Sequence, residues 1–331
     1  MKTGKLSNEQ LQKLILDRLP PLGEDVVAGA GIGIDCALVK SPPGFLVVSA
    51  DPITGAAANI GRLAVHISCN DIAACAIMPT ALTMVVIAPP DATEAELSTV
   101  IDDAASAAKS IGVSIIGGHT EVSDAVTRFV IMTTAFGFSA GKQPIDSRNC
   151  KPGDTLIMTK TAGLEGTAIL AADQAERLKD VLSEAELTAA QNLIEEISVI
   201  PEGVLCADLP VHGLHDSTEG GILGAVYELS DAAGCGCEVR LADISVDPLT
   251  ARITGALALD PYRLLASGSL LIATPEPAVV LDALAVAGIP AAAIGELTKG
   301  PERWQTGPAG KSPLEPPAAD ELYRIQTEST L

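Results

Sequence analysis

Three acidic residues in the first part of the chain lie at positions that suit metal binding. Asp35 follows a glycine-rich turn, Asp51 ends a strand-like segment, and Asp71 lies in the strongly apolar stretch 69–75. An unpaired carboxylate in such an environment costs several kcal/mol. A buried polar network is one explanation of Asp71, and an ordinary turn before Pro52 is one explanation of Asp51. Carboxylates that converge on Mg²⁺ explain Asp71 better, because hard divalent cations take oxygen ligands and bridge to nucleotide phosphates.

A second acidic group lies far along the chain, just before an expected helix. Asp216 and Glu219 flank Ser-Thr at the start of the segment that runs from Thr218 to Gly234. The simpler explanation of Asp216 is helix capping. If these acids meet those of the first part, the cation site is built from both halves of the chain. The nearby pair His212 and His215 is only a weak zinc signal, because the glycine between them indicates a loop rather than one face of a helix.

Two pairs of glycines supply the groups that phosphate binding requires. Gly117-Gly118 follows a strand-like segment, and Gly220-Gly221 opens a helix. Glycine lets backbone N–H groups approach an oxyanion closely, and a helix N-terminus adds a favourable dipole. The alternatives are a tight turn for the first pair and close packing of a helix end for the second.

The amino-acid composition limits the kinds of molecule that the protein can bind and indicates where it is found. The chain has 21 Lys and Arg against 42 Asp and Glu, a net charge of −21. Such a field repels phosphate backbones, so we expect no nucleic-acid binding, and an anionic substrate must be met by bound cations or backbone dipoles. Neither a signal-peptide pattern nor a long uninterrupted apolar run occurs, so no membrane association is expected. The cysteines are few and odd in number, which predicts reduced thiols in a cytoplasmic protein.

The length and the pattern of elements predict two domains of α+β type. A chain of 331 residues exceeds one ordinary core. Strand-like and helix-like segments alternate in both halves without the short regular period of a barrel. A polar turn cluster at 146–154 marks the expected boundary between domains 1–149 and 150–298. Residues 299–331 are rich in proline and poor in periodic apolar positions, so we expect a loosely ordered tail there.

Six short motifs occur along the chain in an order that is more specific than any one of them. They are Gly-x-Gly-Ile-Asp35-Cys-Ala, Ser-Ala-Asp51, the run from Asn59 through Asn-Asp71-Ile-Ala-Ala, Gly-Gly-His-Thr-Glu121, the run from Pro-Gly-Asp154 through Lys160-x-x-Gly-x-Glu-Gly166, and Asp216-Ser-Thr-Glu-Gly-Gly221. In this order they resemble the PurM-like superfamily of aminoimidazole ribonucleotide (AIR) synthetase. Hydrogenase-maturation proteins of the HypE type, selenophosphate synthetase and thiamine-monophosphate kinase are other members.

The resemblance implies an N-terminal domain whose strands form a barrel across a homodimer, a C-terminal α/β domain, and ATP with Mg²⁺ between them. It also implies roles for individual residues. The residues that match the family's metal-binding acids, with Glu219 beside them, are Asp35, Asp51, Asp71, Asp216 and Glu219. The residues expected to bind the nucleotide are Gly33, Asn70, Gly117, Gly118, Thr120, Thr218, Gly220 and Gly221. The catalytic candidates are His119, Glu121 and Lys160, with a structural hydrogen bond as the alternative role of His119.

Some positions depart from the family pattern, and they affect which subfamily the chain resembles. The run Met158–Ala168 looks most like the HypE branch, but this chain ends in Leu331 where HypE-type proteins end in cysteine, and it has Glu219 where they usually carry arginine. The leading hypothesis is an ATP- and Mg²⁺-dependent enzyme that activates an amide or carbonyl oxygen of a small or protein-borne acceptor. A small-molecule kinase resembling thiamine-monophosphate kinase is one alternative. A nucleotide-binding maturation or scaffold protein without turnover is another, and Ile34, where many relatives carry an acid, motivates it.

Overall fold

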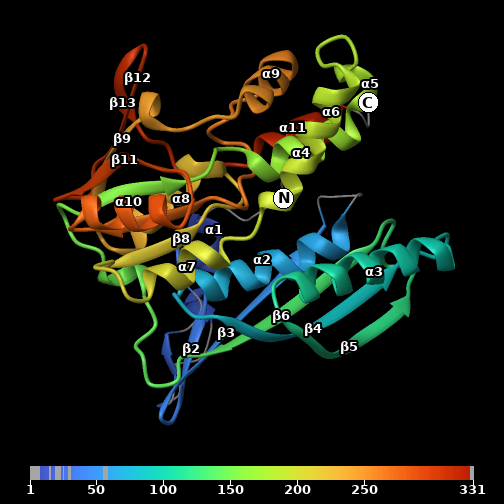
Figure 1. Cartoon of the computed structure of the whole chain (residues 1–331), viewed down its shortest axis with the longest axis horizontal. Helices are drawn as coiled ribbons and strands as arrows, with labels where there is room; N and C mark the ends of the chain where they lie inside the picture. The colour runs from blue at the N-terminus through green and yellow to red at the C-terminus, as the bar shows by residue number, and fades with distance from the viewer. Residues whose placement is uncertain are drawn as a thin grey trace.

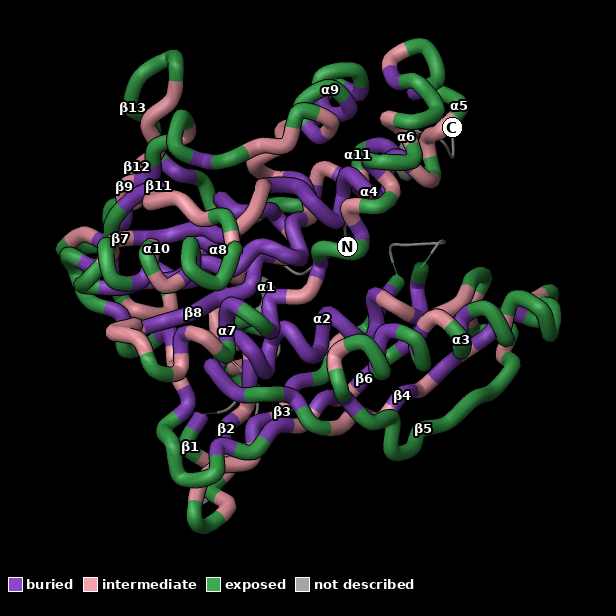
Figure 2. The backbone as a smooth tube through the Cα atoms, in the orientation of Figure 1, coloured by how far each residue is buried: buried purple, intermediate pink, exposed green. Residues whose placement is uncertain are grey.

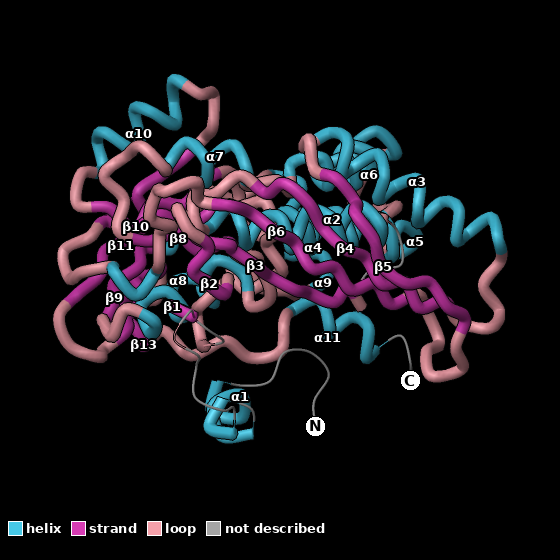
Figure 3. The backbone as a smooth tube through the Cα atoms, turned by 90° about the horizontal axis from the view of Figure 1, so that it is seen from below, coloured by secondary structure: helices cyan, strands magenta, loops and turns pink. Residues whose placement is uncertain are grey.

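Two β-sheets, one in each half of the chain, organise the fold (Figure 1). The structure is a computed structural model. It describes residues 8–14, 16–18, 24, 26–28, 31–54 and 59–328. Near the N-terminus, α1 (Asn8–Leu14) and the short helix η1 (Leu16–Arg18) precede the first sheet. Figure 3 shows α1 set apart from both sheets.

The first sheet has six strands in the order β1-β2-β3-β6-β4-β5. Their bounds are β1 Val26–Ala28, β2 Ala37–Ser41, β3 Gly44–Ile53, β6 Val130–Phe138, β4 Pro79–Ala88 and β5 Ser114–Val122. Burial alternates along the central strands, because successive side chains point to opposite faces. The helices α2 (Ile60–Ala74) and α3 (Glu94–Ser110) cover one face. A capping box of Thr93 and Glu96 begins α3.

Helix α2 lies between the first sheet and the second half of the chain, and every residue in it except Arg62 is buried (Figure 2). Asn70 joins the two halves with both ends of its amide. Its Nδ2 donates to the carbonyl of Ile197 at 2.7 Å, and its Oδ1 accepts from the N–H of Val199 at 2.9 Å. At Gly203 a Cβ would lie 2.2 Å from the Ala73 carbonyl oxygen, so the close contact of α2 with the second half requires glycine there.

The second sheet has seven strands in the order β13-β12-β9-β11-β7-β10-β8. Their bounds are β7 Thr155–Thr159, β8 Gly213–Asp216, β9 Gly236–Arg240, β10 Leu270–Thr274, β11 Ala291–Thr298, β12 Arg303–Gly307 and β13 Gly310–Pro313. The strands β7, β8 and β10 are almost wholly buried. This explains the largely apolar sequences of β7 and β10, whereas β8 buries His215 and Asp216. Strand β8, at the edge of this sheet, contacts α2, and Asp216 is its last residue.

The second half of the chain also contains helices, some of which contact the second sheet whereas others contact one another. They are α4 Leu164–Asp173, α5 Ala175–Leu178, α6 Glu184–Gln191, α7 Ile200–Cys206, α8 Gly221–Ala232, α9 Pro248–Leu257 and α10 Pro277–Val286, with the short helices η2 Ser147–Asn149, η3 Asn192–Glu196 and η4 Leu241–Asp243. The mixed architecture of two sheets with helices agrees with the predicted α+β class. Within the described ranges, no helix combines the length and apolar character needed to cross a membrane.

The segment after residue 299 is more ordered than its proline content suggests. Strand β12 pairs with β9 in parallel, β13 pairs back onto β12, and α11 (Glu321–Glu328) follows. Leu314, Leu322 and Ile325 are all at most 3% exposed. The expectation of a loosely ordered tail is therefore wrong for 303–328. Leu322 and Ile325 have helical spacing but form a single pair, and Leu314 stands alone, so the sequence shows no sustained period. These residues are buried because they pack into the hydrophobic cores formed with distant parts of the chain.

Candidate functional site

A cavity of about 1020 Å³ lies between the two halves of the chain. Its walls come from the loop before β2, from β3, from α2 and from the turn that joins β8 to α8. The predicted site residues that line it are Gly33, Asp35, Asp51, Asp71, Asp216, Thr218 and Glu219. The acids predicted from both halves of the sequence therefore meet in one place.

Asp71 and Asp51 occupy the wall formed by α2 and β3. Asp71 is 8% exposed, and its Oδ2 accepts a hydrogen bond from the Ser49 hydroxyl. The same hydroxyl lies 3.3 Å from Asp51 Oδ2. The alternation of β3 points Ser49 inward, toward α2, and places Asp51 two residues further along on the same face. Ser49 therefore links the two carboxylates.

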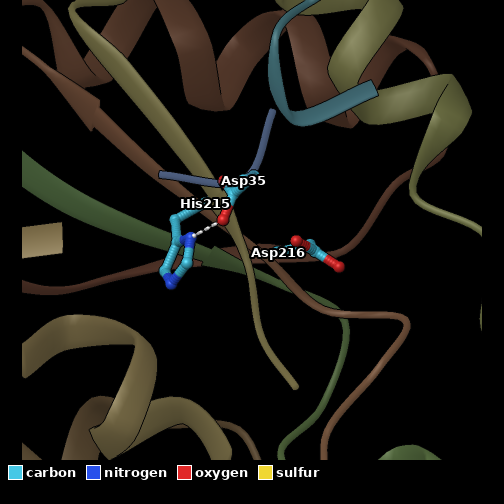
Figure 4. A group of neighbouring side chains, drawn as sticks. All are labelled: Asp35, His215 and Asp216. Carbon is cyan, nitrogen blue, oxygen red and sulfur yellow. Dashed lines mark ion pairs between the residues drawn. The ribbon is translucent and has the colours of Figure 1, made fainter. Parts of the chain in front are cut away.

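Asp35 and Asp216 lie together with a third residue, His215 (Figure 4). One potential ligand atom from each of the three lies within 4.8 Å of the others. The ring Nδ1 of His215 is 2.6 Å from Asp35 Oδ1, and its Nε2 is 3.3 Å from Glu228 Oε2 on α8. Asp216 is 2% exposed, and its Oδ2 lacks a hydrogen-bond partner among the described residues.

The crowding of carboxylates perturbs the site's proton equilibria. Burial, and then the charge of Asp35, raises the pKa of Asp216 to about 7. Burial and the neighbouring charges of Asp216 and Asp51 raise the pKa of Asp71 well above its ordinary value. Burial alone would lower the pKa of His215, but the carboxylates of Asp35 and Glu228 outweigh it and raise that pKa. Without a counterion, Asp71 and Asp216 therefore hold their protons to a higher pH than ordinary aspartates do.

The donor set fits a hard divalent cation. Four aspartates face one cavity, and one of their oxygens, Asp216 Oδ2, is buried without a partner in the described structure. Mg²⁺ takes oxygen ligands and displaces protons from the groups it binds. Asp35, Asp51, Asp71 and Asp216 are the residues that would hold it.

Glu219 and Gly220 make contacts with the last helix. Tyr323 Oη lies 2.8 Å from Glu219 Oε1, and both residues line the cavity. The N–H of Gly220 donates to Asp320 Oδ2 at 2.7 Å, and that of Gly221 donates to the carbonyl of Thr218. Neither glycine is among the residues that line the cavity. The predicted anion-binding N–H groups are therefore engaged within the protein.

The predicted phosphate-loop residues do not reach the cavity. Gly117, Gly118, His119, Thr120 and Glu121 all lie on β5, at the outer edge of the first sheet, and all are exposed. His119 Nε2 lies 3.3 Å from Glu121 Oε2. The strand continues through the two glycines because it pairs with β4 in parallel as far as Val122, whereas the sequence suggests a loop after Ile116.

Lys160 is likewise outside the cavity lining, although the sequence suggests a catalytic role. Its Nζ donates to three backbone carbonyls at 2.6 to 3.0 Å and lies 2.7 Å from the fully buried carboxylate of Glu202. The carbonyls belong to Glu196, Ser198 and Gly268. These contacts use the ammonium group to hold segments of the second domain together.

Two cavity residues that the prediction did not include are Glu165 and Ser267, at the base of α4 and beside β10. Glu165 is 4% exposed, its Oε2 lacks a hydrogen-bond partner among the described residues, and burial raises its pKa to about 7. Glu165 stands inside the motif that ends at Gly166, so the motif gives its position. Its contact with the cavity depends on the fold of the turn at Gly163, where α4 begins.

Comparisons with known proteins agree with the order of the motifs. The family model "AIR synthase related protein, N-terminal domain" matches residues 33–139, and the C-terminal domain model of the same family matches 151–303. The carbamoyl dehydratase HypE of Escherichia coli is 30% identical over 284 residues, covering 83% of this chain and 81% of that protein. A hydrogenase expression/formation protein of Methanocaldococcus jannaschii is 27% identical over 282 residues, covering 82% of this chain and 81% of the relative.

The fold is also shared with a solved structure. A hydrogenase maturation protein HypE, crystallised in complex with ATP, superimposes with a TM-score of 0.72 at 22% identity, covering 97% of each chain. At this identity the likeness shows the fold alone. Together with the family matches, it confirms the resemblance that the six motifs indicate.

Proposed function

The chain belongs to the AIR synthase related protein family, and on this basis we propose that it is an ATP- and Mg²⁺-dependent enzyme that phosphorylates an amide or carbonyl oxygen of an acceptor. The observation that carries the proposal is the meeting of acids from both halves of the chain in one cavity, with Asp216 Oδ2 buried and unpartnered in the described structure. The relatives named carbamoyl dehydratase and the ATP complex of a protein with the same fold support it.

In this proposal, aspartates on two sides of the cavity bind the cation. Asp71 and Asp51 hold the cation from the first domain, and Asp35 and Asp216 hold it from the opposite side. Bound Mg²⁺ would neutralise the triphosphate within this acidic site, so that no covalent protein nucleophile is needed. Arg128 also lines the cavity, and its guanidinium suits a phosphate oxygen.

Glu165 is our candidate for the proton acceptor, in place of His119 and Glu121. It lines the cavity, whereas the two β5 residues do not. A carboxyl group whose pKa is about 7 can take up and release a proton at neutral pH. When an amide oxygen attacks the γ-phosphorus, ADP leaves and the amide nitrogen loses a proton, which Glu165 would accept.

The test combines nucleotide binding with turnover. Mg-ATP should raise the melting temperature of the wild-type protein, and Asp71→Asn should lose this increase. Asp154→Asn is the matched control, because Asp154 is a buried aspartate outside the cavity, paired with His212 at 2.9 Å. Release of ADP should then be followed across a panel of primary carboxamides. An unchanged Mg-ATP effect in Asp71→Asn would contradict the metal role.

We also propose that two copies of the chain associate through the uncovered face of the first sheet. Met132 and Phe138 are 39% and 57% exposed on that face, and Ile116 and Val122 on β5 are 63% and 67% exposed. Exposed apolar patches on a sheet mark interaction surfaces, and an edge strand offers free backbone groups for pairing. The resulting homodimer would place the β5 motif at the interface.

Light scattering after gel filtration tests the dimer. Phe138→Glu should shift the protein toward the monomer, whereas Val286→Glu should not, because Val286 is 90% exposed on α10 in the other domain. Dimers of unchanged stability in Phe138→Glu would exclude this face. We place the protein in the cytoplasm, since ATP is available there and all seven cysteines are free thiols.

A kinase acting on a small phosphorylated molecule is the second candidate. The acidic Glu219, held by Tyr323 at the cavity wall, favours it, because this chain has an acid where HypE-type proteins usually carry arginine. ADP release that thiamine monophosphate stimulates, and carboxamides do not, would decide for the kinase.

A further inference from the structure

His215 is the one imidazole among the described residues that line the cavity, and it is held from two sides. The residue lies on β8, which pairs with β10 along its whole length, so its backbone is fixed. Its side chain is 6% exposed. Nδ1 lies 2.6 Å from Asp35 Oδ1, and Nε2 lies 3.3 Å from Glu228 Oε2 on α8.

These contacts decide between two roles for the ring. The first role is that of a direct metal ligand, since Asp35, His215 and Asp216 can approach one ion. A ligating imidazole must offer a ring nitrogen with a free lone pair. Both nitrogens of His215 face carboxylates instead, and Mg²⁺ prefers oxygen ligands. The second role, that of orienting a ligand, agrees with both contacts.

Asp35 is the residue that needs orienting. It lies between the glycine turn at 31–33 and β2, in a stretch without regular secondary structure. Asp216, in contrast, ends a buried strand. The ring therefore connects an acid on a loop to the rigid sheet of the second domain.

We infer that His215 is a positioning residue for the cation site: it holds the Asp35 carboxylate beside Asp216, and Glu228 in turn holds the ring. The inference rests on the proposed function, because it takes these acids to bind a Mg²⁺–nucleotide. Residues that orient metal ligands in this way change metal affinity by about 10- to 100-fold when they are replaced.

Two substitutions separate this role from a general contribution to stability. In His215→Asn the amide nitrogen takes approximately the place of Nδ1, so the contact with Asp35 is retained. In His215→Gln the amide nitrogen lies near the place of Nε2, so the contact with Glu228 is retained and that with Asp35 is lost. Both variants remove the ring, and their effects on the fold should be similar.

The measurement is the free Mg²⁺ concentration that gives half of the increase in melting temperature at a fixed, saturating concentration of a non-hydrolysable ATP analogue. We expect His215→Gln to raise this concentration about tenfold and His215→Asn to raise it less than about threefold. His212→Asn and His212→Gln are the matched controls. His212 pairs with Asp154 at 2.9 Å outside the cavity, so neither control should alter the Mg²⁺ requirement.

The outcomes distinguish the inference from the function on which it rests. A wild-type protein without any Mg²⁺-dependent effect would overturn both. Two results would overturn the positioning role alone, provided that the wild type responds normally to Mg²⁺. One is an unchanged Mg²⁺ requirement in His215→Gln, and the other is an equal increase of the requirement in His215→Gln and His215→Asn. If either variant fails to fold, Glu228→Gln tests the same link at its other end, and an unchanged Mg²⁺ requirement there would also contradict the inference.

Discussion

Replacing Asp216 by asparagine should stabilise the protein in the absence of Mg²⁺ and abolish its response to Mg²⁺–nucleotide. The carboxylate is 2% exposed, its Oδ2 has no hydrogen-bond partner in the described structure, and Asp35 lies beside it. Asparagine has nearly the same shape and carries no charge. The variant therefore removes an unfavourable charge from the unliganded protein and, at the same time, a ligand from the cation site.

The magnitude follows from the pKa of Asp216, which rises from 3.8 to about 7 on folding. Because the folded pKa is the higher one, the stabilising effect of the bound proton is complete below pH 3.8 and is lost as the pH rises through 7. Three pH units correspond to about 4 kcal/mol. Side-chain movement and water entry reduce such penalties, so we expect about 2 to 4 kcal/mol. For a chain of this size, that is an increase in melting temperature of about 3 to 6 °C.

The assay is thermal unfolding of both proteins between pH 4 and pH 8 without divalent cations, and then with Mg²⁺ and an ATP analogue. Without divalent cations, the difference in melting temperature between Asp216→Asn and the wild type should be small at pH 4 and should reach its largest value at pH 8. Asp154→Asn is the contrasting control, because the buried Asp154 carboxylate accepts a hydrogen bond from the N–H of Lys151 at 2.7 Å and pairs with His212 at 2.9 Å. That variant should lose about 1 to 3 kcal/mol. If Asp216→Asn is less stable than the wild type at pH 8, the reasoning is refuted.

Three further predictions concern residues outside the acidic cluster. Lys160→Met should lower the free energy of unfolding, measured in urea, by about 3 to 5 kcal/mol, because it leaves Glu202 buried without its cation. The Mg²⁺–nucleotide response should persist, and its selective loss would restore a catalytic role. Gly118→Ala should reduce the yield of folded protein, because φ is +151° and a Cβ would lie 1.8 Å from the Met84 carbonyl oxygen. Gly117→Ala, with nothing within 4 Å, should fold normally, and equal behaviour of the pair would contradict the observed strand pairing. Burial lowers the pKa of His66 from 6.5 to about 4, so stability is lost as the pH falls through this range. The wild type should lose up to about 3 kcal/mol more than His66→Gln between pH 6.5 and 4, and parallel curves would count against a neutral buried ring.

The acids of the site were predictable because local signals mark them. A carboxylate in an apolar helix, as at Asp71, or directly before a helix, as at Asp216, is conspicuous in the sequence alone. The strand-like segment that ends at Asp51 and the apolar stretch around Asp71 are visible in the sequence, and they correspond to β3 and to the end of α2. The ligand roles of these residues remain predictions.

Other features depend on contacts between distant segments, which no local pattern specifies. The role of His215 depends on Asp35, far away in the chain, and on Glu228, one helix later. Lys160 stands beside a glycine turn typical of an active site, yet three carbonyls from two distant segments bind its ammonium group. The β5 motif has the glycines of a phosphate loop, but strand pairing with β4 extends it along the sheet edge.

Asp320 makes the end of the chain part of the same cooperative unit as the acidic cluster. Most chain ends fray independently of the rest of a protein. Here, detachment of Asp320 together with α11 would remove the acceptor of the Gly220 N–H, 100 residues earlier in the sequence, and the contact of Tyr323 with Glu219. Amide hydrogen exchange in α11 should therefore slow when a ligand orders the turn after β8, so that the last helix reports on events in a site built mainly by other parts of the chain.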